Sequence, residues 1–188
     1  SPMTYTAPDP RSPKEAWDDQ HRLAASHPFP WILKADSLIA AFETLIAEET
    51  RNLAAGQFVP QLSGVAYMLA GFAIEALLKA LLIQSKPALD TKGKFNLRSH
   101  HLVELADDVS LLATEEEGRL LEKLEEFLTW AGRYPIPLTS DPMRPRPLPN
   151  GGFAPRTYHG IGEDWTAIRV LIQKLKQRLP NVPYEQPS

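Results

Sequence analysis

The sequence contains no cysteine, and this absence removes several chemistries at once. Disulfide scaffolds, thiolate zinc sites, iron–sulfur clusters and cysteine nucleophiles all need a thiol. The chain also lacks the Walker phosphate loop, the Gly-Xaa-Gly-Xaa-Xaa-Gly fingerprint, the HExxH zinc pair and the Gly-Xaa-Ser-Xaa-Gly elbow. The signatures of the commonest enzyme classes are therefore missing, and we expect neither a cofactor nor a bound metal.

A strong excess of either charge is missing as well. The chain has 20 basic and 23 acidic residues, so its formal net charge is -3. Any site for a polyanion would therefore have to be a local patch. The N-terminal stretch "SPMTYTAPDPRSPKE" lacks the apolar run of a signal peptide, and we predict a cytoplasmic protein.

One apolar run, residues 64–83 ("GVAYMLAGFAIEALLKALLI"), is long enough by count to cross a bilayer. Glu75 and Lys79 lie well inside it, and each would cost roughly 2.5–3.5 kcal/mol near the middle of a membrane. We therefore predict the central core helix of a soluble protein, with no membrane among its partners. A chain of 188 residues with 43% apolar content can build one domain around such a helix.

Helical periodicity dominates the rest of the chain, and no alternating strand pattern flanked by hairpin turns is found. Helices are predicted over residues 30–56, 64–83, 100–112, 115–131 and 163–179, with a further turn within residues 13–27. Their apolar stripes place Leu53 and Leu112 among the inward-facing residues. The predicted fold class is all-α, an antiparallel up-and-down bundle of about five helices over residues 30–179. Residues 1–29 are expected to form a partly helical arm, and residues 180–188 a tail.

The start of the helix at residues 115–131 has a specific signature. Thr114 precedes it, and Glu117 stands at the third helical position, so the two can form a capping box. The acids of the "TEEE" stretch also suit the positive end of the helix dipole.

A proline-rich and arginine-rich loop, residues 133–162, precedes the last helix and holds seven of the 18 prolines. It contains Arg133, Arg144, Arg146 and Arg156 against a single acid, Asp141. We expect a functional arm that is ordered by itself or by a partner, because long loops without secondary structure are uncommon in compact domains. The alternatives are a disordered loop, and an arm that lies on the acidic face of the preceding helix in its own or a neighbouring chain.

Glu75 and Lys79 have the order and spacing of an ion pair one helical turn apart. They could share a strip where the central helix meets water. If another subunit or the arm covers that strip, hydrogen bonds must satisfy the pair, because unpaired burial is costly.

His100 and His101 follow Ser99, which is a candidate helix cap. In a first turn the dipole disfavours protonation, so a neutral imidazole could act as a base, or both side chains could simply be exposed. Arg133 and Tyr134 stand at a helix end, where Arg133 could satisfy terminal carbonyls or grip a phosphate.

Three patches in this order resemble a HEPN domain: "AIEALLKALLI", then "SHHLVELADD" opening a helix, then "AGRYP" closing the next. The resemblance covers about residues 30–179. It implies a small bundle that dimerises through helices, found in prokaryotic defence, toxin–antitoxin and nucleotide-linked systems. Many HEPN proteins are metal-independent RNases with an arginine four to six residues before a histidine. Here His100 and His101 follow Arg98 too closely, and so does His159 after Arg156.

Three hypotheses follow. The first is a non-catalytic or degenerate HEPN-like homodimer that serves as an interaction module for RNA, a nucleotide or a partner protein such as an antitoxin or nucleotidyltransferase. Its ligand-binding residues would be Glu75, Lys79, Tyr134, Arg144, Arg146 and Arg156. The second is a metal-independent RNase with His101 or His100 as base and Arg133 as phosphate clamp. The third is a purely structural bundle whose arm docks a partner.

Overall fold

The computed structural model describes residues 14–56, 62–86, 88–90, 92–94, 96–97, 99–134, 139–141, 144–147, 151–154 and 163–180. These residues are mostly helical, which confirms the all-α class. The helices are α1 (Lys14–Ala25), α2 (Phe29–Ala54), α3 (Ser63–Ile83), α4 (Leu102–Asp108), α5 (Glu115–Glu126) and α6 (Glu163–Lys176). A π-helical turn, η1 (Phe127–Ala131), continues α5. Two short strands that the periodicity did not indicate, β1 (Arg146–Pro147) and β2 (Phe153–Ala154), pair antiparallel in the arm.

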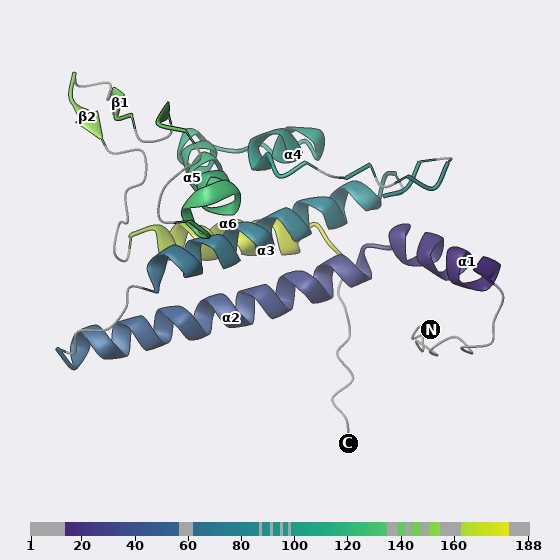
Figure 1. Cartoon of the computed structure of the whole chain (residues 1–188), viewed down its shortest axis with the longest axis horizontal. Helices are drawn as coiled ribbons and strands as arrows, with labels where there is room; N and C mark the ends of the chain where they lie inside the picture. The colour runs from purple at the N-terminus through teal and green to yellow at the C-terminus, as the bar shows by residue number, and fades with distance from the viewer. Residues whose placement is uncertain are drawn as a thin grey trace.

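Helix α3 is the central element of the fold, as predicted. Every residue from Ala73 to Ile83 is buried. Helix α2 lies along α3 and runs in the opposite direction, α6 lies behind α3, and α5 crosses them at a steep angle (Figure 1). Helix α3 is long and apolar enough to cross a membrane, but 83% of its most apolar window is buried. Such burial is typical of the core helix of a soluble protein.

Two residues predicted to face inward do not. Leu53 is 55% exposed and Leu112 is 89% exposed. The last turns of α2, which contain Leu53, extend past the start of α3, so no helix among the described residues lies beside them (Figure 1). Leu112 lies in the segment between α4 and α5, because α4 ends at Asp108 and the chain turns at Ser110 with a φ of 51°. The helical phase that would have turned Leu112 inward is therefore lost.

An aromatic and polar cluster joins α3, α5 and α6. The fully buried ring of Tyr67 stacks on Phe127 with a centroid distance of 4.7 Å and contacts Trp165 at 4.4 Å. Its hydroxyl donates to Asp164 at 2.5 Å, and Lys123 pairs with the same carboxylate. The buried hydroxyl of Tyr67 thus has a partner, as a hydroxyl in a core requires.

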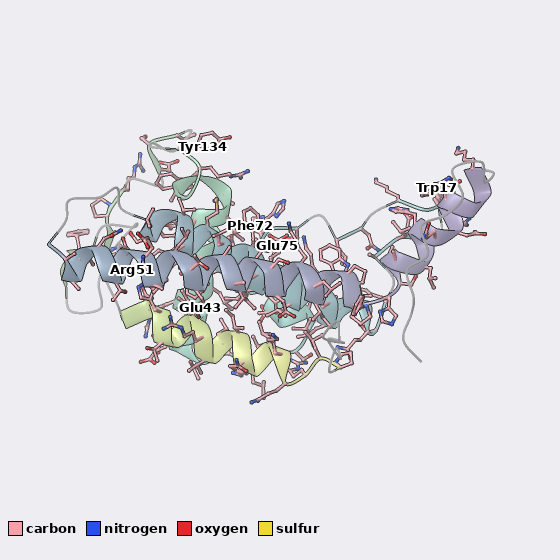
Figure 2. All side chains as sticks on the ribbon, turned by 90° about the horizontal axis from the view of Figure 1, so that it is seen from below. Trp17, Glu43, Arg51, Phe72, Glu75 and Tyr134 are labelled. Carbon is pink, nitrogen blue, oxygen red and sulfur yellow. The ribbon has the colours of Figure 1, made fainter. Side chains whose placement is uncertain are left out.

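The cations of α6 reach other elements instead of their own helix end. Arg169 binds Glu43 of α2 through two hydrogen bonds of 2.8 and 2.7 Å, and Lys176 binds Asp36 at 2.6 Å. The hydrogen bonds from Arg169 hold the pKa of the Glu43 carboxyl below its usual value. Figure 2 shows α6 on one side of α2, with Glu43 labelled on α2. These pairs fix α6 along one side of α2.

The predicted capping box at the start of α5 is confirmed. The Thr114 hydroxyl accepts from the Glu117 backbone N–H, and the Glu117 carboxylate accepts from the Thr114 N–H. Lys174 of α6 also donates to Glu117 at 2.8 Å. Burial acts to raise the pKa of Glu117, but the hydrogen bonds from Lys174 and Thr114 outweigh it, and the pKa is lowered.

Gly132 allows the end of α5 to approach α3 closely. Its N–H donates to the carbonyl of Phe127 at 3.1 Å, which closes the π turn. A Cβ at Gly132 would lie 2.5 Å from Cβ of Met68 and 2.8 Å from the Phe127 oxygen. The contact requires glycine for its small size, since its φ of -82° suits any residue.

We predict that Gly132→Ala lowers the free energy of unfolding by about 1–3 kcal/mol, because the added methyl overpacks the contact with Met68. Urea denaturation followed by circular dichroism measures this change. Gly118→Ala is the matched control in α5, where a Cβ meets nothing within 4 Å. It should stabilise the protein by up to about 1 kcal/mol through helix propensity. Equal midpoints for the two variants would contradict the packing argument.

Candidate functional site

Glu75 and Lys79 form a buried ion pair, so the expectation of a water-facing strip is wrong. Their side chains are 9% and 3% exposed. Lys79 Nζ donates to Glu75 Oε1 at 2.5 Å and lies 5.7 Å from the centroid of the Trp31 ring. Burial of both charges carries a desolvation cost that only close pairing can offset. The pair is therefore satisfied in the way the alternative expectation required.

His100 completes this cluster from the loop after α3. Its Nδ1 lies 3.0 Å from Oε2 of Glu75, while 59% of its side chain is exposed. Both oxygens of Glu75 thus have partners. Because Nδ1 faces the carboxylate, Nε2 is the ring nitrogen left for another group.

His101 makes a second imidazole–carboxylate pair, with Glu125 of α5. Its Nδ1 lies 2.9 Å from Glu125 Oε1, and the other carboxylate oxygen accepts from the Leu102 backbone N–H at 2.9 Å. Glu125 therefore satisfies a backbone donor at the start of α4. The expected cap by Ser99 is wrong in detail, because α4 begins at Leu102 and Ser99 accepts from the N–H of His101, before the helix.

Glu125 shifts the pKa of His101 in the direction opposite to the one expected from the helix dipole. The hydrogen bond and the negative charge of Glu125 raise the pKa of His101 above its ordinary value, and they outweigh burial, which acts to lower it. A raised pKa in the folded state favours folding while the ring is charged. This contribution is fully present below the unfolded pKa and is lost as pH rises through the folded pKa.

Arg133 and Tyr134 lie at the end of the π turn. One guanidinium nitrogen of Arg133 donates to the carbonyl of Thr129 at 2.9 Å, and the guanidinium lies 5.9 Å from the Tyr134 ring centroid. Arg133 thus satisfies a terminal carbonyl, one of its two expected roles. Glu125, which holds His101, lies in the last turn of α5, whereas Arg133 lies beyond η1, eight residues further along the chain. No contact described here joins Arg133 to either histidine.

The arginines of the arm are brought to no common site among the described residues. Arg144 pairs with Asp141 at 3.3 Å on the surface. Arg146 lies in β1, but its side chain is outside the described part of the structure. Arg156 lies outside the described residues altogether, as do Arg98 and His159.

An apolar groove lies beside the Glu75 cluster, between α2 and α3. It encloses about 470 Å³. Its lining residues are Trp31, Lys34, Leu38, Met68, Leu69, Phe72, Glu75 and Ala76. Figure 2 shows Phe72 and Glu75 on the side of α2 away from α6, with Tyr134 farther out on the same side. The groove therefore marks the face of the α2–α3 pair that α6 leaves uncovered.

Two features of this site were missed from the sequence. Glu125 stands in the acidic helix predicted over residues 115–131, and no partner was expected for it, although it binds both His101 and the start of α4. Trp31, within the helix predicted over residues 30–56, is half-buried and lines the groove. No sequence signal links Glu125 to His101, because their helices meet only through the fold.

Among the described residues, no group of three or more His, Asp or Glu side chains is arranged to hold a metal ion. The chain matches no protein-family model, no curated protein and no solved structure.

We predict that Lys79→Met lowers the free energy of unfolding by about 3–5 kcal/mol, because it leaves the Glu75 carboxylate buried without its ammonium partner. Thermal and urea unfolding measure the loss. The double variant Glu75→Leu/Lys79→Met should be more stable than Lys79→Met, since it removes both charges. Lys86→Met, the same change at an exposed lysine, should stay within about 0.5 kcal/mol of the original protein. A double variant no more stable than Lys79→Met would contradict this account of the pair.

Proposed function

We propose that this protein is a HEPN-like interaction module, without catalytic activity of its own, that works as a homodimer in the cytoplasm. Its partners would be RNA, a nucleotide or a protein such as an antitoxin or nucleotidyltransferase. The observation that carries the proposal is the uncovered face of the α2–α3 pair. Half-buried apolar residues on this face flank a groove, and exposed apolar surface of this kind marks interaction sites.

A stripe on α2 next to the groove has a pattern that suits contact with a second copy. Lys34, Leu38, Ala41, Leu45 and Glu48 recur at intervals of four and three, so they lie on one side of the helix. Going outward from Ala41 in either direction, the stripe has a leucine and then a charged residue. The charged residue is a cation at one end and an acid at the other. Two such stripes are complementary when they run antiparallel.

The twofold axis of this pairing would pass near Ala41, which is small and exposed and allows the two helices to approach. Lys34 and Glu48 are each seven residues from Ala41, so Lys34 of one copy meets Glu48 of the other twice. Lys34 has no ion-pair partner within the described residues, whereas Glu48 pairs with exposed Arg51. Charge complementarity thus supports a second copy of this chain as the occupant of the face.

We predict a mass of twice the 21.0 kDa chain by light scattering at micromolar concentrations. Ala41→Glu should weaken the dimer at least tenfold, because it places two like charges at the axis. Ala40→Glu is the matched control, since Ala40 is also exposed but lies on another side of α2. Lys34→Glu should weaken the dimer, and Lys34→Glu/Glu48→Lys should restore it. A monomeric protein, or equal effects of Ala40→Glu and Ala41→Glu, would refute this interface.

A second candidate function, a metal-independent RNase, is favoured by the two imidazole–carboxylate pairs. His100 and His101 are neighbours, and each has Nδ1 oriented by an acid while most of the ring is exposed. Attack by a ribose 2′-hydroxyl needs a base and an acid near the phosphate, and such oriented imidazoles supply both roles. Arg133, just past η1, would have to serve as the cation from a second segment.

Incubation of the purified protein with total RNA in EDTA separates the two functions. The leading proposal predicts intact RNA across pH and salt. Cleavage that persists in EDTA, disappears in His100→Ala/His101→Ala and remains in His21→Ala would establish the RNase instead. His21 is the matched control, because it is an exposed histidine on α1.

A further inference from the structure

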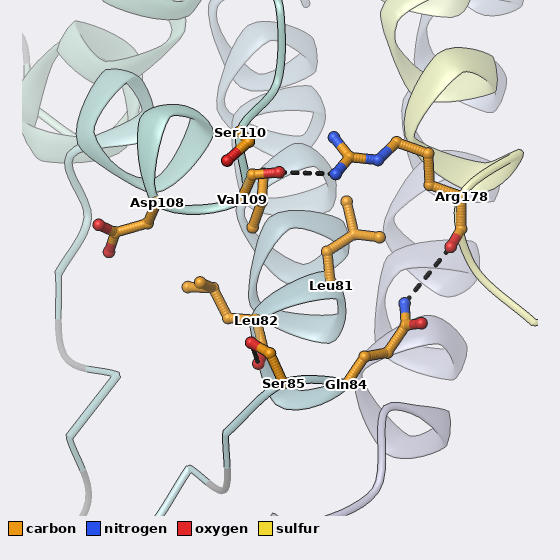
Figure 3. Close-up of a pocket in the computed structure, with 8 residues that line it drawn as sticks. All are labelled: Leu81, Leu82, Gln84, Ser85, Asp108, Val109, Ser110 and Arg178. Atoms are coloured by element: carbon orange, nitrogen blue, oxygen red, sulfur yellow. Dashed lines mark hydrogen bonds between the residues drawn. The ribbon is translucent and has the colours of Figure 1, made fainter.

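A second hollow lies where the C-terminal ends of α3, α4 and α6 come together. It encloses about 300 Å³. Its lining residues are Leu81, Leu82, Gln84, Ser85, Asp108, Val109, Ser110 and Arg178 (Figure 3). None of them belongs to the α2 stripe or to the histidine pairs, so this hollow is independent of the function proposed above.

The backbone carbonyls around the hollow already have donors. The Leu82 oxygen accepts from the N–H groups of Ser85 and Lys86 and from the Ser85 hydroxyl. The Val109 oxygen accepts from one guanidinium nitrogen of Arg178 at 2.6 Å, and the Arg178 oxygen accepts from the Gln84 amide at 3.4 Å. The carbonyl acceptors that the ends of these three helices bring together are therefore largely occupied.

Donors remain in excess at the same place. Arg178 uses one of its five N–H groups on Val109, and its side chain is exposed. Ser110 also lines the hollow, at a backbone φ of 51°. Its hydroxyl lies toward the Asp108 side in Figure 3, and another χ1 rotamer turns it toward the guanidinium. The Asp108 carboxylate points away from the other lining residues (Figure 3). The positive charge of the Arg178 guanidinium is thus the formal charge that faces the hollow.

We propose that this hollow binds a small carboxylate with a short aliphatic body. The free edge of the Arg178 guanidinium takes the carboxylate, since its planar fork matches two oxygens. The Ser110 hydroxyl donates to the same group. Leu81, Leu82 and Val109 provide an apolar floor for the aliphatic body, which distinguishes this ligand from inorganic phosphate. The volume lies at the lower end of the range for small-molecule sites.

Titration of the full chain with acetate, butyrate, hexanoate and inorganic phosphate, followed by amide chemical shifts, tests the proposal. We expect shifts at Ser85, Val109 and Ser110, with affinity rising roughly fourfold for each added buried methylene. Phosphate should bind more weakly than hexanoate. Equal binding of phosphate and hexanoate would show a plain anion site and overturn the assignment, as would the lack of any shift with millimolar hexanoate.

Two variants keep the test independent of folding. Ser110→Gly removes the hydroxyl, and its positive φ suits glycine, so the fold should be retained while hexanoate affinity falls roughly threefold to tenfold. Arg178→Lys keeps the charge but loses the fork, and should weaken hexanoate at least tenfold. Arg119→Lys, at an exposed arginine paired with Glu115, is the matched control and should change nothing. Unchanged affinity in Arg178→Lys would refute the site.

Discussion

The structure depends on the enclosure of a helix that is apolar almost all round and yet carries two charges. Burial of α3 removes a large apolar area from water, which is the main favourable contribution to folding. Glu75 and Lys79 oppose it, because each loses hydration when the helix is covered. Their 2.5 Å hydrogen bond, with His100 on the second carboxylate oxygen, keeps both charges satisfied. The core can therefore close over them.

The enclosure also explains why one face stays open. Helix α6 is fixed on one side by ion pairs to α2 and by the Tyr67 cluster, and the small size of Gly132 lets the chain after η1 approach Met68 of α3. The opposite side of the α2–α3 pair carries the groove, and Gly132, just after η1, contacts Met68, one of its lining residues. There the apolar residues are half-buried, and the groove ends at Glu75. The charged pair thus stands where the buried core meets the uncovered face.

Local patterns predicted the fold wherever local forces decide it. The α3 run, the α6 stripe and the capping box of Thr114 were read correctly, because each rests on spacing within one helix. The same reasoning failed for Leu53 and Leu112, since their burial depends on where neighbouring helices begin and end. The spacing of apolar residues in one helix does not indicate where the helices packed against it begin or end.

The candidate site was predicted only in its components. The one-turn spacing of Glu75 and Lys79 indicated a pair, but its burial depends on α2 and on the loop that carries His100. The helix dipole, which is a local term, was expected to lower the pKa of His101, whereas Glu125 raises it. The deciding charge, Glu125, comes from a helix that begins 13 residues after α4 starts. Two adjacent histidines thus acquire acids from α3 and α5, and this loop joins those helices whether or not the imidazoles move a proton.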